Sequence, residues 1–227
     1  MKKKLILIRH GQSIYNLENK FTGWKDVDLT KKGIEEAIDA GKILKKENIK
    51  PDYAFTSVLK RAQKTLNLIL QEMNITIPIE YNLALNERDY GSLIGQNKAD
   101  ASKKFGAEQV QIWRRSYDVP PPDGESLKMT CERVYPYMKS NIMSKFDKYD
   151  NILISAHGNS IRSIVMKLLN FSPENILKTE IGWCEPWVFY FDDNYNIIDF
   201  KIICLNSNSS NSSLPYIPKF KMEKCDD

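Results

Sequence analysis

Long hydrophobic runs are missing from this chain of 227 residues. No apolar stretch approaches the roughly 20 residues that a membrane-spanning helix requires. The basic residues Lys2 to Lys4 precede the apolar run Leu5 to Ile8, but that run is too short for the hydrophobic region of a secretory signal peptide. The sequence therefore predicts a cytoplasmic protein with no membrane partner.

A strong excess of charge of one sign is also missing. Lysine and arginine number 33, aspartate and glutamate 29, and the net charge is +4. The lysines are scattered along the chain, whereas a nucleic-acid-binding protein usually concentrates its basic residues. We therefore expect no nucleic-acid partner. A small anionic substrate remains compatible with this composition, because a local cluster of arginines does not need a large net charge.

Cysteine and histidine are scarce. The four cysteines, Cys131, Cys184, Cys204 and Cys225, show no C-x-x-C spacing, which argues against both a zinc site and a disulfide framework. We expect all four to be free thiols. The chain has only two histidines, and no cysteines or carboxylates with ligand spacing accompany them, so we expect no metal.

The chain does contain a repeated alternation of short apolar runs with longer segments of helical period. This alternation predicts an α/β fold, a three-layer sandwich with a largely parallel central sheet and helices on both faces. The length fits one catalytic domain, which we place at 1–205, and the tail at 206–227, rich in Asn and Ser, is expected to be mobile. Strands are predicted at 5–8, 53–56, 75–81, 151–155, 187–191 and 197–203, and helices at 30–46, 58–73, 98–113, 127–144 and 160–169.

A few residues predict how these elements begin and where they lie. Thr30 is the expected N-cap of the first helix, and Ser57 that of the second, whose buried stripe starts at Val58. Pro78 restricts its strand to the edge of the sheet, because proline has no amide hydrogen to donate. The last two strands flank a short polar turn, which predicts a hairpin.

Both histidines occupy the same local setting. His10 and His157 each follow a buried apolar strand and each precede a glycine, Gly11 or Gly158. Open parallel sheets bind ligands beyond the carboxyl ends of their strands, and a glycine lets a ligand approach the backbone closely. The two imidazoles are therefore expected at the edge of the sheet where this fold class carries out its chemistry.

This pair of histidines allows three interpretations. One lone histidine is usually a core or surface residue, but that reading weakens when every histidine of the chain recurs in one context. A metal pair lacks further ligands. Nucleophilic catalysis suits the pattern better, because an imidazole nitrogen can hold a phosphoryl group covalently and divide one difficult transfer into two easier ones.

Phosphate chemistry also needs cations and an acid. Arg9 adjoins His10, and Arg61 lies in the first turn of the helix after strand 53–56; guanidinium groups match phosphate oxygens two at a time. Arg162 is one turn into the helix after His157, where it either binds or simply packs. The polar loop at 85–91 carries two candidate general acids, Glu87 and Asp89, and spacing alone does not choose between them.

These motifs resemble those of a known family. The chain is similar to the histidine phosphatase superfamily and, within it, to the cofactor-dependent phosphoglycerate mutases, over about Lys4 to Leu205. The blocks that carry the resemblance are Arg9-His10-Gly11-Gln12-Ser13 with Asn16, Phe21-Thr22-Gly23-Trp24, Val27 to Thr30, Thr56 to Ala62, Leu85 to Arg88, Ile112 to Asp118 and Ala156 to Ser160. Seven blocks in the same order are far more specific than an Arg-His-Gly triplet alone.

The resemblance implies specific roles. His10 would be the phosphorylated nucleophile, Glu87 the proton donor and acceptor, and His157 would stabilise the transferring phosphoryl group with Arg9 and Arg61. It further implies phosphoglycerate substrates, priming by 2,3-bisphosphoglycerate, no metal, and a homodimer or homotetramer. The implied substrate-binding residues are Gly11, Gln12, Ser13, Asn16, Thr22, Gly23, Arg88, Tyr90, Lys98, Arg114, Arg115, Gly158 and Asn159.

Two departures from the family bear on the reaction. Asp89 stands where the family usually has a histidine, and its negative charge is expected to act on the phosphate site. The segment Ile181 to Pro186, with Trp183 and Cys184, replaces a smaller and less aromatic stretch. Three functions therefore stay open: a mutase, a phosphatase that hydrolyses a small phosphorylated metabolite through the same phosphohistidine, and a non-catalytic module that binds phosphoproteins. The lysine and the arginine pair at 98 and 114–115 favour the mutase.

Overall fold

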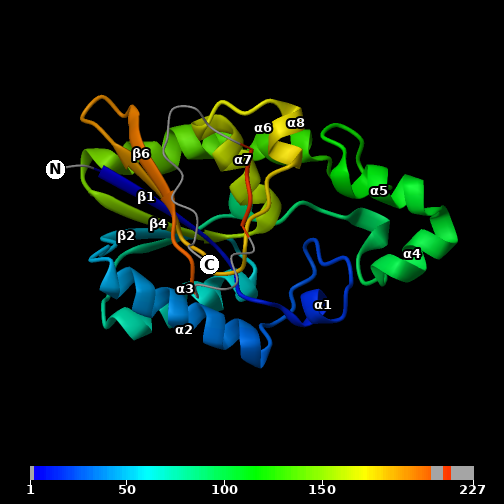
Figure 1. Ribbon diagram of the computed structural model, residues 1–227, viewed down its shortest axis with the longest axis horizontal. Helices are drawn as coiled ribbons and strands as arrows, with labels where there is room; N and C mark the ends of the chain where they lie inside the picture. The colour runs from blue at the N-terminus through cyan, green and yellow to red at the C-terminus, as the bar shows by residue number, and fades with distance from the viewer. Residues whose placement is uncertain (1–2, 206–211, 216–227) are drawn as a thin grey trace.

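The computed structural model describes residues 3–205 and 212–215, and a six-stranded sheet forms its centre (Figure 1). The strand order is β3-β2-β4-β1-β5-β6. The first four of these strands run parallel to their neighbours, and β5 and β6 are antiparallel. The predicted α/β class is thus confirmed, with a sheet that is mixed because the hairpin adds two antiparallel strands. The strands are β1 (Lys3–Arg9), β2 (Tyr53–Thr56), β3 (Ile79–Tyr81), β4 (Asn151–Ala156), β5 (Trp187–Phe191) and β6 (Ile197–Ile202).

Helices cover both faces of this sheet, as Figure 1 shows, with α2 and α3 on one side and α6, α7 and α8 on the other. Side chains alternate along a strand, so Leu5 and Leu7 of β1 pack into the core of the α6–α8 side. Ile6 and Ile8 pack into the core under α2 and α3. The helices are α1 (Ile14–Leu17), α2 (Lys31–Lys46), α3 (Lys60–Met73), α4 (Lys98–Phe105), α5 (Ala107–Arg115), α6 (Leu127–Tyr137), α7 (Gly158–Leu168) and α8 (Pro173–Leu177).

Two sequence signals are confirmed in detail. Thr30 caps α2, because its side chain accepts a hydrogen bond from the amide of Gly33. Strand β3 lies at an edge of the sheet, as Pro78 predicted, but it begins only at Ile79. The carbonyl of Pro78 still accepts a hydrogen bond from the amide of Ala54 in β2. Pro78 therefore pairs with β2 through its carbonyl alone, because proline has no N–H to donate.

Three helix predictions were wrong at their ends. The helix predicted over 98–113 is two helices, α4 and α5, separated by Gly106 at φ +87°, a conformation that glycine adopts readily. Helix α6 gives way to a π-helical turn at Met138–Ile142 and a 3-10 turn at Met143–Asp147, just after Pro136. Helix α3 starts at Lys60, with no side-chain cap from Ser57, and Val58 is 44% exposed.

A small satellite lies beside the sheet. Helices α4 and α5 project away from the main body next to α1 (Figure 1). They share a separate hydrophobic cluster of Phe21, Leu93, Ala101 and Val110. This satellite carries part of the pocket described below.

Other expectations have mixed outcomes. Cys131 and Cys184 are free and buried, but Cys204 is disulfide-bonded, so the prediction of four free thiols was wrong. Within residues 3–205 and 212–215, no helix is long and apolar enough to cross a membrane. Most of the tail predicted to be mobile lies outside the described residues, and the extent of the domain stays a prediction.

Candidate active site

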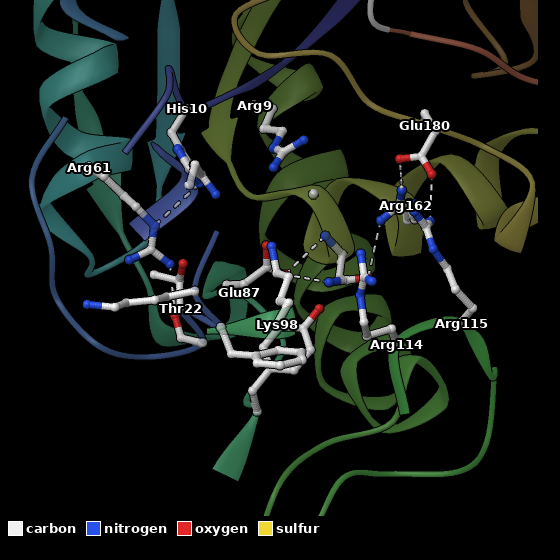
Figure 2. Close-up of a pocket in the computed structure, with 17 residues that line it drawn as sticks. Arg9, His10, Thr22, Arg61, Glu87, Lys98, Arg114, Arg115, Arg162 and Glu180 are labelled. Carbon is white, nitrogen blue, oxygen red and sulfur yellow. Dashed lines mark hydrogen bonds and ion pairs between the residues drawn. The ribbon is translucent and has the colours of Figure 1, made fainter. Parts of the chain in front are cut away.

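A polar pocket of about 150 Å³ opens at the carboxyl ends of the parallel strands. Strands β1, β2 and β4 end at Arg9, Thr56 and Ala156, and the sequence context of both histidines predicted this location. Seven lysine and arginine side chains face two carboxylates here (Figure 2). The lining residues are Arg9, His10, Asn16, Lys20, Phe21, Thr22, Gly23, Arg61, Glu87, Tyr90, Lys98, Arg114, Arg115, Gly158, Asn159, Arg162 and Glu180.

His10 is oriented as a nucleophile. Its Nδ1 lies 2.7 Å from the carbonyl oxygen of Gly11, so Nδ1 carries the hydrogen and Nε2 keeps its lone pair. Burial, with Arg61 and Arg9, lowers the pKa of His10 well below the ordinary histidine value, although the bond to Gly11 acts in the opposite direction. The ring is therefore neutral near pH 7, and Nε2 is available to attack phosphorus.

Arg61 is held rigidly against this nitrogen. Its Nε lies 3.3 Å from Nε2 of His10, and its two terminal nitrogens donate to the carbonyls of Lys25 and Gly23. The side chain is fully buried, and burial lowers the pKa of Arg61 to about 10. It stays charged at neutral pH and places one N–H where a phosphoryl group on His10 would lie.

Arg9 supplies a second cation between the histidine and the far end of the pocket (Figure 2). One terminal nitrogen donates to the carbonyl of Ile181 at 2.8 Å, and the guanidinium lies 5.5 Å from the ring centre of Trp183. Its Nε is buried and has no hydrogen-bond partner among the described residues. A buried donor without a partner is costly, so this N–H is suited to a ligand oxygen.

His157 lies directly behind His10. The two ring centres are 5.0 Å apart, and the planes meet at 62°. Nε2 of His157 is 2.7 Å from the hydroxyl of Ser57, while Nδ1 is buried with no partner in the part of the chain that the structure describes. Burial, with Arg61 and His10, lowers the pKa of His157 well below the ordinary value, so this ring is also neutral near pH 7.

Glu87 presents one bonded and one less engaged oxygen. Its Oε1 accepts hydrogen bonds from the amide of Arg88 at 2.8 Å and from the amide and side chain of Asn159 at 3.1 and 2.9 Å. Three N–H donors bind Oε1, which leaves Oε2 as the oxygen better placed to exchange a proton with a ligand. Gly158 lies between Glu87 and Arg9, since a Cβ there would meet both side chains at 3.6–3.7 Å.

The far end of the pocket is built from the satellite and its surroundings. Lys98, Arg114 and Arg115 line it from α4 and α5. Burial lowers the pKa of Lys98. The charges of Arg114 and Arg9 also lower this pKa, whereas Tyr90 raises it. Several cations at one end of a pocket suit an anionic group of the ligand.

Four residues that the resemblance implied as substrate contacts lie behind the pocket wall. Gly11 packs against Gly33, because a Cβ on Gly11 would come within 2.2 Å of the Gly33 carbonyl. Ser13 caps α1 and binds the amide oxygen of Asn16. The amide of Gln12 donates to Glu36, and Arg88 lies under the ring of Tyr90. These residues position the wall, and a direct substrate contact from them stays a prediction.

The two departures from the family lie outside the pocket. Asp89 accepts a hydrogen bond from the amide of Gly91 at 2.9 Å and is not a lining residue, so the expected action of its charge on the phosphate site finds no support in this geometry. Trp183 packs behind Arg9, and the amide of Cys184 donates to the Arg9 carbonyl. The Ile181 to Pro186 segment thus supports Arg9 from outside the pocket.

Several pocket residues were not predicted from the sequence. Lys20 and Phe21 line the pocket near Asn16, and Arg162, left open between binding and packing, also lines it. Glu180 binds Arg115 and Arg162. Arg162 had a sequence signal in its spacing from His157, and Phe21 belongs to a block that carries the family resemblance. Within the described residues, no group of three or more His, Cys, Asp or Glu side chains is arranged to hold a metal ion.

Comparisons with known proteins identify the family of this chain. The profile of the histidine phosphatase superfamily (branch 1) matches residues 5–200. A protein of Rhodopseudomonas palustris named 2,3-bisphosphoglycerate-dependent phosphoglycerate mutase is 56% identical over 186 residues, which cover 82% of this chain and 90% of the relative. A protein of the same name from Parvibaculum lavamentivorans is 51% identical over 199 residues, 87% of this chain and 95% of the relative.

Solved structures share the fold at lower identity. The α-ribazole phosphatase of Shigella flexneri superimposes with a TM-score of 0.73 at 24% identity, over 85% of this chain and 92% of that one. A mycobacterial glucosyl-3-phosphoglycerate phosphatase complexed with VO3 gives 0.76 at 21% identity, over 93% and 100%. With the profile match over most of its length and the paired histidines at the sheet edge, this chain belongs to the histidine phosphatase superfamily.

Proposed function

We propose that this chain is a 2,3-bisphosphoglycerate-dependent phosphoglycerate mutase that interconverts 3-phosphoglycerate and 2-phosphoglycerate through a phosphohistidine at His10. The observation that carries the proposal is the neutral His10 ring, with Nδ1 bonded to Gly11 and Nε2 facing Arg61. Relatives named as this mutase, at 51–56% identity over most of the chain, support the substrate class.

Each step assigns a role to a residue of this chain. Nε2 of His10 forms a bond to phosphorus as the P–O bond to the donor breaks, and Oε2 of Glu87 gives its proton to the departing oxygen. Arg61, Arg9 and His157 stabilise the charge on the phosphoryl group. In the return step Glu87 takes the proton of the attacking hydroxyl, and the phosphoryl group leaves His10.

The far end of the pocket supports a mutase over a simple phosphatase. A mutase must hold a ligand that carries a carboxylate and a second phosphate while its position changes. Lys98, Arg114 and Arg115 line the pocket on the side away from His10, where they would bind those groups. The cations of the same pocket, together with the unpartnered Nε of Arg9, suit the charge of 2,3-bisphosphoglycerate. This compound would supply the phosphoryl group that primes His10.

Phosphorylation and product analysis test this proposal. Incubation with 2,3-bisphosphoglycerate is expected to place an acid-labile phosphoryl group on His10, located by mass spectrometry, and His10→Ala is expected to remove both the label and turnover. With 3-phosphoglycerate as substrate, 2-phosphoglycerate is expected to form faster than free phosphate. Free phosphate as the main product would make the chain a phosphatase, and no adduct at all would leave only a binding module.

A variant of Arg114 distinguishes substrate binding at the far end of the pocket from the chemical step at His10. Arg114→Ala is expected mainly to raise KM and to increase the fraction of phosphoryl groups lost to water, because a loosely held ligand leaves phosphohistidine open to hydrolysis. Normal mutase kinetics in this variant would contradict a role for Arg114 in binding.

We further propose that the enzyme works in the cytoplasm as a homodimer or homotetramer. Sedimentation analysis tests the oligomeric state, and cell fractionation tests the location.

A further inference from the structure

A carboxylate lies inside the cationic pocket, at the end away from His10. Oε1 of Glu180 is 2.5 Å from a terminal nitrogen of Arg115, and Oε2 is 2.6 Å from one of Arg162. Figure 2 shows Glu180 bound to both guanidinium groups, on the opposite side of Arg9 from Arg61. Its side chain is 40% exposed and lines the pocket, so the pair of bonds forms at a solvent-accessible part of the pocket wall.

The backbone around Glu180 is fixed. Its amide and carbonyl exchange hydrogen bonds with Ser213 at 2.8 and 3.0 Å. The next carbonyl, that of Ile181, accepts a bond from Arg9. Although burial acts to raise the pKa of Glu180, Arg162 and Arg115 lower it below the ordinary value. The side chain is therefore an anion, held at a defined place in the pocket.

The bonds of Glu180 occupy donors that a ligand anion would need. Arg162 gives its other described bonds to the carbonyl of Thr179 and the side chain of Asn159. The described bond of the Arg115 side chain is the one to Glu180. A ligand carboxylate or phosphate that approaches Arg115 therefore shares this guanidinium with Glu180, and it meets the repulsion of a like charge.

We propose that Glu180 is a built-in competitor for the anionic group at the far end of the ligand and thereby sets the affinity of that end of the pocket. The inference rests on the proposed function, because it takes phosphoglycerate as the ligand. A pocket with seven cations and little opposing charge would hold a multiply charged product tightly. Glu180 weakens that hold, so that product release stays fast.

Equilibrium binding to the unphosphorylated chain tests the inference without turnover. Glu180→Gln is expected to bind 3-phosphoglycerate roughly three- to tenfold more tightly than the native chain, as expected for removal of one partly exposed like charge a few ångströms away. Glycerol 3-phosphate, which has a hydroxymethyl group in place of the carboxylate, is expected to gain less. In turnover, KM is expected to fall while kcat does not rise.

A matched control separates the local effect from net charge. Glu174→Gln removes the same charge from α8, where Glu174 pairs with Lys178 on the surface, and is expected to leave the affinity unchanged. Equal tightening in both variants would overturn the inference. Weaker binding in Glu180→Gln would also overturn it, since it would mean that Glu180 only positions the arginines.

A second variant guards against an effect of the glutamine itself. Glu180→Ala also removes the carboxylate, and it must change the affinity for 3-phosphoglycerate in the same direction. A native chain that binds no 3-phosphoglycerate would refute the proposed function and this inference with it. A native chain that binds it, with both variants unchanged, would refute the competitor role alone.

Discussion

The hydroxyl of Ser57 is expected to control catalysis through His157, although Ser57 does not line the pocket. Both residues are fully buried, and the hydroxyl lies 2.7 Å from Nε2 of His157. Because the ring is neutral, the position of its single hydrogen depends on this bond. Ser57→Ala leaves Nε2 without its partner and lets the ring change its orientation and tautomer.

The size of the effect follows from the burial of this bond. A buried polar group left without a partner costs about 1–3 kcal/mol, which for a chain of this length lowers Tm by about 2–12 °C. If the transition state loses the same energy, kcat falls about 5- to 150-fold. Ser57→Thr keeps the hydroxyl and is expected to recover much of the rate.

Three measurements test this expectation. Steady-state kinetics gives kcat, and thermal unfolding gives Tm. Nitrogen NMR of ¹⁵N-histidine protein follows the tautomer directly, because the chain has only two histidines. Ser155→Ala is the control, a buried serine that donates to the carbonyl of Ala62 and is expected to lower Tm with little loss of kcat. Native kcat and unchanged histidine signals in Ser57→Ala would refute the reasoning.

Further predictions follow from the same geometry. Asp89→Asn is expected to leave KM within about twofold, because the side chain accepts a hydrogen bond from the backbone amide of Gly91 outside the pocket. A large change in kinetics would show that the charge of Asp89 acts on the phosphate. The pKa values of His10 and His157 are lowered in the folded protein, so below about pH 6.5 the unfolded chain binds more protons at these rings than the folded protein does. The free energy of unfolding is therefore expected to fall below that pH, by up to about 1.4 kcal/mol per pH unit for each ring. Urea unfolding between pH 7.5 and 5.5 measures this slope, and His10→Asn is expected to reduce it; an equal slope in that variant would contradict the assignment. Gly33→Ala is expected to lower stability by about 1–3 kcal/mol and also kcat, since its Cβ would come within 2.2 Å of the carbonyl oxygen of Gln12, two residues after His10; native Tm and kcat would show that the loop adjusts freely.

Much of the fold was predictable because the signals are local. The apolar runs and the capping threonine act within a few residues. They placed helix α2 and every strand except β3 to within two residues, whereas β3 begins four residues later than predicted. Gly106 marks the break between α4 and α5, but the helical period on both sides of it predicts one continuous helix. The end of α6 depends on how the turns after Pro136 pack against the sheet, which periodicity does not report.

The candidate site divides in the same way. His10, His157 and Arg61 follow strand ends, so one rule of sheet topology brings them together. That rule also applies to Ser57, which directly follows β2, although a capping role was predicted for it instead. Glu180 lies in an irregular segment and meets Arg115 only through tertiary folding, so no pattern in its neighbourhood indicates a pocket residue.

The satellite of α4 and α5 has a consequence for how the two ends of the pocket move. His10 is anchored to the central sheet, whereas Lys98 and Arg115 belong to helices whose own cluster has four buried residues. Small packing units open locally at lower free energy than a central sheet. We therefore expect the satellite to open locally at a lower free energy than the sheet that positions His10, and a ligand bound at both ends of the pocket is expected to suppress this opening.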